Sequence, residues 1–283
     1  MSTPTAHSST STRLAKVDYF TLNTALGGSA GSPKLKVTAS AENPSIQTTS
    51  GQNTYGDPVV VDAYGKTYAP SSEYELVAAI SNQVITLGTI TTNTIDGTAN
   101  TPVCLGSLSI STQTGSAPKI SASGQVVPAS MTTPIRTYKL PAITLSTRHR
   151  AQDIFANPLF TITKGANAAS SEYDYGLSSV NANFPIEFTL AQPQGDLVNY
   201  DLHGGMITVD YALNWYSATA PVIALNTTDW AGGIIPITID DDNVFNAAMT
   251  LTTPQSRSDP ENGYTQYTFQ ISIPLVGSDY SAS

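Results

Sequence analysis

Short apolar runs alternate with polar residues along nearly the whole chain, and clusters of Gly, Pro, Asn and Ser separate them. In "GMITVDYALNWYS" and "YTQYTFQISIPLV" every second residue is apolar, which predicts strands with one buried face. The predicted strands are 18–23, 34–40, 58–64, 83–90, 105–111, 119–127, 137–146, 159–163, 185–192, 205–217, 221–226, 234–240, 247–253 and 264–276. The pattern therefore predicts an all-β fold, an antiparallel sandwich or barrel of the jelly-roll or tail-tube kind.

At most two short helices are expected. Residues 71–81 place Ser72 three residues before Glu75, a capping-box spacing, with Leu76 and Ile80 following on one helical face. Residues 148–156 would form two turns before Pro158 ends them.

The predicted organisation is a flexible N-terminal arm, 1–16, followed by a β-rich domain, 17–283. The arm is rich in Ser and Thr and has little to bury. The domain is either one unit or two β modules, with turn-rich stretches at 94–104 and 163–176 as alternative boundaries. A weak repeat, "GSPKLKVTAS" against "GSAPKISAS", is compatible with two modules, although the Pro and Gly residues common before strands and in turns explain it better than duplication does.

Composition favours contacts between proteins over contacts with nucleic acid. Charged residues make up 12% of the chain, and the formal net charge is −9. A surface of hydroxyls and amides suits an exterior covered by further copies of the same chain. A charge buried at such a contact loses its hydration, and the contact is weakened unless the charge is paired. Binding to the phosphates of a nucleic-acid backbone would require clustered Lys and Arg, so direct nucleic-acid binding is not expected. No signal peptide or membrane span is predicted.

The charges that exist are distributed unevenly. Residues 165–256 contain no Lys or Arg, whereas Arg136, Lys139, Arg148 and Arg150 form a basic group. A solvated acidic face explains the asymmetry, but head-to-tail contact between subunits would also use it. The interface candidates are Arg13, Lys16, Arg136, Lys139, Arg148, Arg150, Asp240, Asp241 and Asp242, with the basic group of one subunit facing the acidic run of the next.

The acidic run at Asp240, Asp241 and Asp242 is the strongest candidate for chemistry. Asp240 and Asp242 match the first and third positions of an EF-hand loop, but Val244, Phe245 and Leu251 occupy the fifth, sixth and twelfth. Asp and Asn also form turns without an ion, because their side chains bond to nearby backbone. We therefore expect an acidic turn, with Asp240 and Asp242 as a weak calcium candidate, and no cofactor.

The remaining candidates are weaker. Cys104 is the only cysteine, so an intrachain disulfide is excluded and a buried, unreactive thiol is expected. Trp215 and Trp230 would support a carbohydrate-binding module if either lay exposed on a concave face. A hydrolase would need convergent carboxylates, for which the chain offers Glu172, Glu187, Asp201 and Asp210, without a catalytic motif. We expect no enzymatic activity.

In overall style the chain resembles virus and bacteriophage structural proteins. It has one cysteine, many Ser, Thr and Gly residues, a long succession of predicted strands, an N-terminal arm, and the terminal run "QISIPLVGSDYSAS". The resemblance implies a coat or tail subunit of the virion, made in the host cytoplasm, whose partners are other copies of itself and other virion proteins.

Overall fold

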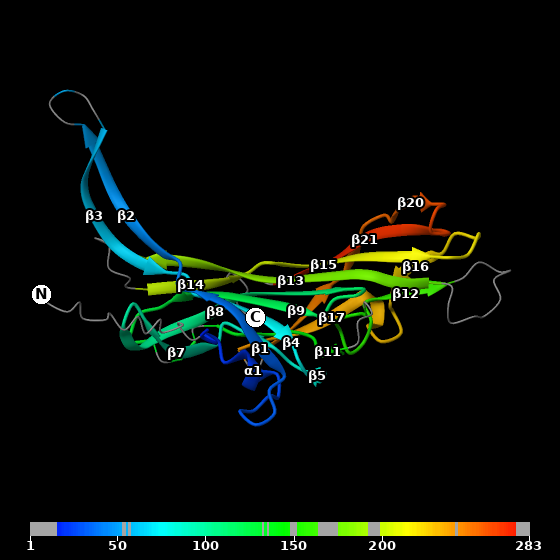
Figure 1. The fold of residues 1–283 in the computed structure, drawn as a ribbon, viewed down its shortest axis with the longest axis horizontal. Coiled ribbons are helices and arrows are strands. Elements are labelled where there is room, and N and C mark those ends of the chain that lie inside the picture. The colour runs from blue at the N-terminus through cyan, green and yellow to red at the C-terminus, as the bar shows by residue number, and fades with distance from the viewer. Residues whose placement is uncertain are drawn as a thin grey trace, which may run out of the picture.

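The structure is a computed structural model that describes residues 16–52, 55, 58–131, 133–134, 136–147, 152–163, 175–191, 199–240 and 243–275. Of 47–52, 58–65, 187–191 and 199–203 it describes the backbone only. The fold is almost entirely β, with antiparallel sheets, as the sequence predicted (Figure 1). Among the described residues, no helix has the length and apolar character needed to cross a membrane.

One eleven-stranded sheet forms the long axis of the molecule (Figure 1). Its strands run β1–β4–β9–β8–β13–β15–β21–β19, while β7, β14 and β20 pair with β8, β13 and β21, all antiparallel. The bounds are β1 (Leu35–Ala41), β4 (Ser71–Leu76), β7 (Ile90–Ile95), β8 (Thr98–Gln113), β9 (Lys119–Val126), β13 (Tyr175–Ala191), β14 (Asn199–Gly204), β15 (Met206–Trp215), β19 (Thr250–Leu251), β20 (Gln255–Asp259) and β21 (Tyr264–Pro274).

Strand register sorts apolar and polar residues onto opposite faces of this sheet. One row of cross-strand neighbours is apolar throughout: Val37, Tyr74, Ile120, Ile110, Ala182, Val209, Ile271 and Leu251. The adjacent row is polar throughout: Lys36, Glu75, Lys119, Ser111, Asn181, Asp210 and Gln270. Because successive side chains point to opposite faces, the alternation read from the sequence becomes one apolar and one polar face.

Smaller sheets and loops supply the second layer of the core. They are β18 (Asn243–Ala248)–β17 (Ile234–Ile239)–β10 (Tyr138–Lys139)–β6 (Thr86–Leu87), β11 (Ile143–Leu145)–β5 (Ile80–Gln83), and β12 (Phe160–Thr163)–β16 (Val222–Leu225). Their apolar residues join those of the large sheet in a single buried cluster. Phe160 of β12, for example, packs edge-on against two rings of the large sheet. Its ring centroid lies 4.7 Å from that of Tyr211 and 5.0 Å from that of Phe269. The packing is that of a β-sandwich.

A two-stranded hairpin lies outside both layers. β2 (Pro44–Gln52) and β3 (Pro58–Tyr68) pair with each other and with no other described strand. The hairpin extends away from one end of the large sheet, opposite the end that carries β20 (Figure 1). The polar residues of β2 gave no alternating signal, so the sequence predicted only the β3 half.

The predicted helix at 71–81 is wrong, because its first six residues form β4. Ser72, Tyr74 and Leu76 are buried while Glu73 is exposed, which is the two-residue period of a strand. The capping-box spacing was coincidental, and pairing on both sides with β1 and β9 decided the structure. In the second predicted helix, 148–156, the described residues 152–156 are not helical.

The predicted strand at 18–23 is also wrong. Asp18 folds the chain back instead, since its Oδ1 accepts hydrogen bonds from the backbone N–H of Leu22 (3.1 Å) and from the hydroxyl of Tyr74 (2.6 Å). The short helix α1 (Leu22–Ala25) follows, and one 3-10 turn occurs at Ala231–Gly233. The predicted strands 83–90 and 137–146 are each divided, into β5, β6 and β7 and into β10 and β11.

Strands from both sides of each proposed module boundary belong to the large sheet. The stretch 94–104 lies within the β7–β8 hairpin, and β13, which follows 163–176, pairs with β8. The two similar segments of sequence lead into β1 and β9, which flank β4 on its two sides.

Candidate functional site

Asp240, the first residue of the acidic run, lies in a turn at the end of β17. Ile239 of β17 faces Asn243 of β18, so Asp240 begins the connection, with a left-handed φ of 52° that Asp tolerates. Asp241 and Asp242 lie outside the described residues, so the weak calcium candidate is described only at Asp240. Within the described part of the chain, no three His, Cys, Asp or Glu side chains are grouped as a metal site would require.

Arg136 of the basic group and Asp240 of the acidic run meet within one chain. Arg136 Nε lies 3.5 Å from Asp240 Oδ2, and the N–H of Thr137 donates to Asp240 Oδ1 at 2.8 Å. The backbone N–H of Asp240 donates in return to the carbonyl of Thr137 at 3.1 Å, because β10 pairs beside β17. The contact expected between subunits is therefore present inside the chain for these residues.

The other interface candidates are only partly placed. Lys139 lies in β10 between Thr238 and Thr86, and Lys16 is exposed just before the first turn. Arg13, Arg148 and Arg150 lie outside the described residues.

The two tryptophans do not form an exposed platform. Trp215 is 1% exposed, and its indole N–H donates to the carbonyl of Thr219 at 2.7 Å. Trp230 is half-buried and donates to the carbonyl of Pro158 at 3.1 Å. Exposed rings at this end of the sheet include Tyr175, which stacks on Trp215, and Tyr216, which packs edge-on against Tyr264. The feature that would favour a carbohydrate-binding module is thus absent at both tryptophans.

Two further predicted features have a structural explanation. Cys104 is buried, as predicted, and its thiol lies 3.3 Å from the carbonyl of Gly88. Of the four carboxylates considered for hydrolysis, Asp210 accepts a hydrogen bond from Gln270 Nε2 at 2.8 Å on the polar face. Glu172 lies outside the described residues, and Glu187 and Asp201 are described by their backbone alone.

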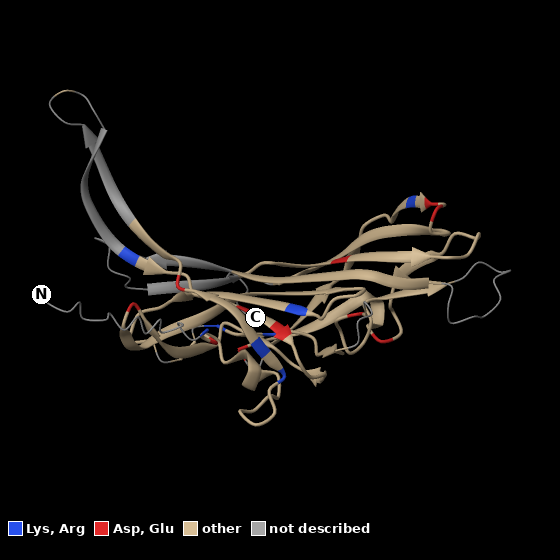
Figure 2. Ribbon diagram, in the orientation of Figure 1, with Lys and Arg blue, Asp and Glu red and all other residues tan. Residues whose placement is uncertain are grey.

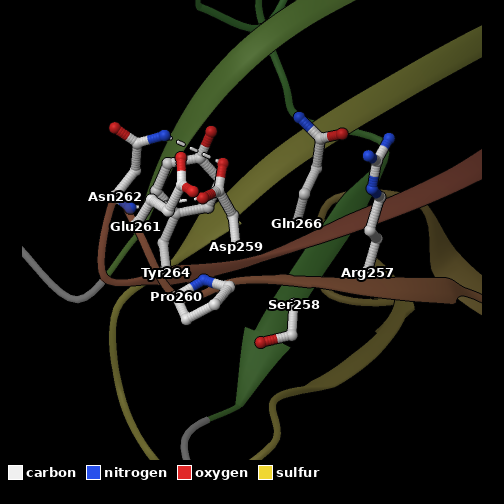
Figure 3. Close-up of a pocket in the computed structure, with 8 residues that line it drawn as sticks. All are labelled: Arg257, Ser258, Asp259, Pro260, Glu261, Asn262, Tyr264 and Gln266. Atoms are coloured by element: carbon white, nitrogen blue, oxygen red, sulfur yellow. Dashed lines mark hydrogen bonds between the residues drawn. The ribbon is translucent and has the colours of Figure 1, made fainter.

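A pocket of about 510 Å³ surrounds the tip of the β20–β21 hairpin (Figure 3). Both the N–H and the side-chain amide of Asn262 donate to Asp259, at 3.2 and 3.0 Å, and these bonds lower the pKa of the Asp259 carboxyl. Arg257 and Gln266, cross-strand neighbours, extend side by side away from this cluster (Figure 3). The bonds between Asp259 and Asn262 close the turn, so hairpin formation explains the arrangement.

Sequence reasoning missed the buried carboxyl of Asp153. The N–H of Ile154 donates to its Oδ1 at 2.7 Å and the Tyr211 hydroxyl does so at 3.2 Å, whereas its buried Oδ2 has no hydrogen-bond partner. Burial raises the pKa of Asp153 to about 6, and the bonds from Ile154 and Tyr211 oppose that rise. Asp153 also lines a pocket of about 380 Å³ with Phe160, Tyr175 and other residues. An isolated Asp in "AQDIFANP" gave no signal of burial.

A cluster of charges ties the root of the β2–β3 hairpin to the large sheet. Lys66 Nζ of β3 lies 2.7 Å from Asp96 Oδ2, in the β7–β8 turn, and the Tyr68 hydroxyl donates to the same oxygen. The N–H of Asp96 donates to Glu42 at 3.1 Å. The bonds from Lys66 and Tyr68 lower the pKa of the Asp96 carboxyl, Lys66 contributing most. The cluster connects the hairpin to the body at its root.

Charge is sparse over the rest of the ribbon (Figure 2). On the polar face the hydroxyl and amide side chains bond to one another: Ser107 and Ser123 hydroxyls lie 2.6 Å apart, and Gln266 bonds to Asn214 at 3.4 Å.

No protein-family model matches the chain, and no curated protein matches it in sequence.

Proposed function

We propose that the protein is a non-enzymatic structural subunit that assembles with copies of itself, as the coat and tail-tube subunits of viruses do. The observation that carries the proposal is the β2–β3 hairpin, which extends from the body and pairs with no other described strand. An isolated two-stranded hairpin is marginally stable in water. The β2–β3 hairpin is therefore expected to pack against a neighbouring molecule.

The polar face supports the same proposal. Over β8, β13, β15 and β21 it consists mostly of Ser, Thr, Asn and Gln, with few charges that contact with another copy would have to desolvate, whereas Lys36, Glu75 and Lys119 lie on β1, β4 and β9. The viral setting and a place in the virion rest on the resemblance of the sequence to virus structural proteins, and other virion proteins are then further partners.

Light scattering on the purified full-length chain, with negative-stain electron microscopy of any large species, tests the proposal. We expect rings, tubes or shells, or discrete oligomers in equilibrium with them. A protein that stays monomeric at all accessible concentrations would contradict it.

A further inference from the structure

Two open edges of the large sheet, β1 and β20, carry features that disfavour pairing with another chain. β1 pairs on one side with β4, and it carries the exposed Lys36 and a bulge between Val37 and Ala39. At the far end, β20 carries Arg257 and Asp259. Charged side chains and bulges at an edge disfavour the addition of a further strand.

The outer edge of β2 lacks these features. Its nine residues, PSIQTTSGQ, include no Lys, Arg, Asp or Glu, and Pro44 stands at the first position, where it leaves the rest of the strand free to pair. By contrast β3 carries Asp62 and Lys66. On its other side β2 pairs with no described strand. A long, uncharged edge of this kind is a template for strand addition.

We propose that the β2 edges of two copies pair with each other, antiparallel, about a twofold axis at Thr48. This inference rests on the proposed function and names the partner as a second copy of the chain. Thr48 is the midpoint of β2, so it would face the partner's Thr48, and the strands on either side would give the order β3–β2–β2–β3.

Three physical arguments favour this partner. Antiparallel pairing of identical strands is self-complementary, which a twofold interface requires. No like charges would meet, because β2 has none, and Thr–Thr cross-strand pairs are favourable. Finally, two marginal hairpins become one four-stranded sheet, above the three strands needed for independent stability. The uncharged β2 edge therefore favours a second β2 edge over the charged edges of β1 and β20.

Substitution at Thr48 places two new charges opposite each other and so tests the pairing. We expect Thr48→Lys and Thr48→Glu each to weaken association at least tenfold, since like charges oppose each other at the axis. An equimolar mixture of the two variants should associate again. The measurement is molar mass by size-exclusion chromatography with light scattering, over a series of concentrations.

A matched control is Thr227→Lys, which adds the same charge at an exposed position in the turn after β16, outside both the hairpin and the polar face. It should associate as the native chain does, and circular dichroism should show all variants folded alike because the hairpin lies outside the core. Thr48→Cys gives an independent readout: Cys104, the only native cysteine, is buried, so mild oxidation should produce a disulfide-linked dimer, which Thr227→Cys should not.

The outcomes separate this inference from the proposed function. If the native chain assembles, the Lys and Glu variants assemble equally well, and oxidation of the Thr48→Cys variant gives no cross-link, the β2 pairing is wrong while self-assembly stands. If the native chain is monomeric at every concentration, both are wrong. Loss of association in both single variants without recovery in the mixture would also overturn pairing at a twofold axis.

Discussion

At the scale of single residues, the titration of Asp153 should change the free energy of unfolding of the whole domain. Its pKa, raised by burial to about 6 from the usual 3.8, means that the folded chain binds the proton more tightly than the unfolded chain. The stabilising effect of the proton is therefore complete below about pH 4 and is lost as the pH rises through about 6.

Asp153→Asn should remove this dependence. Asn keeps an oxygen to accept from Ile154 and Tyr211 and avoids the buried charge. We expect the variant to be more stable than the native chain at pH 7.5, by about 1–3 kcal/mol, with the difference vanishing near pH 4. Urea unfolding at several pH values measures it. Asp153→Ala should destabilise at every pH, because it leaves the N–H of Ile154 unpaired; an Asn variant with the native pH profile would contradict the argument.

At the scale of elements, Asp96 is expected to hold the β2–β3 hairpin at its root. Asp96→Asn keeps the left-handed turn, since Asn before Gly97 suits the φ of 47°, but loses the charge that faces Lys66. Both side chains are about half exposed, so solvent screens the pair and global stability should change little. Hydrogen exchange should nevertheless become faster in β2 and β3 and stay unchanged in β8. Equal acceleration throughout would mean that the cluster stabilises the sheet and not the hairpin.

Sequence predicted elements well where alternation was strong and poorly where side-chain bonds decided the path. The strands that became β15, β17 and β21 follow directly from their two-residue period. Residues 71–76 satisfied a helix-capping spacing and a strand period at once, and only the neighbours β1 and β9 could decide between them. The contact between Arg136 and Asp240 depended on long-range pairing, because it required β10 beside β17, which local sequence does not indicate.

At the scale of the whole molecule, the low density of charge leads to a prediction about salt. The proposed β2 contact has no charges, and the polar face has few over β8, β13, β15 and β21. Native assembly should therefore change little between about 0.05 and 0.5 M NaCl, although the electrostatic screening length shortens several-fold over that range. The mixture of Thr48→Lys and Thr48→Glu is the internal control, because its contact is an ion pair and should weaken as salt rises. Molar mass by light scattering across the salt series measures both. A native assembly that dissociates with salt would instead assign the contact to charged surfaces such as the β20–β21 tip with Arg257 and Asp259, and would place the uncharged β2 edge outside it.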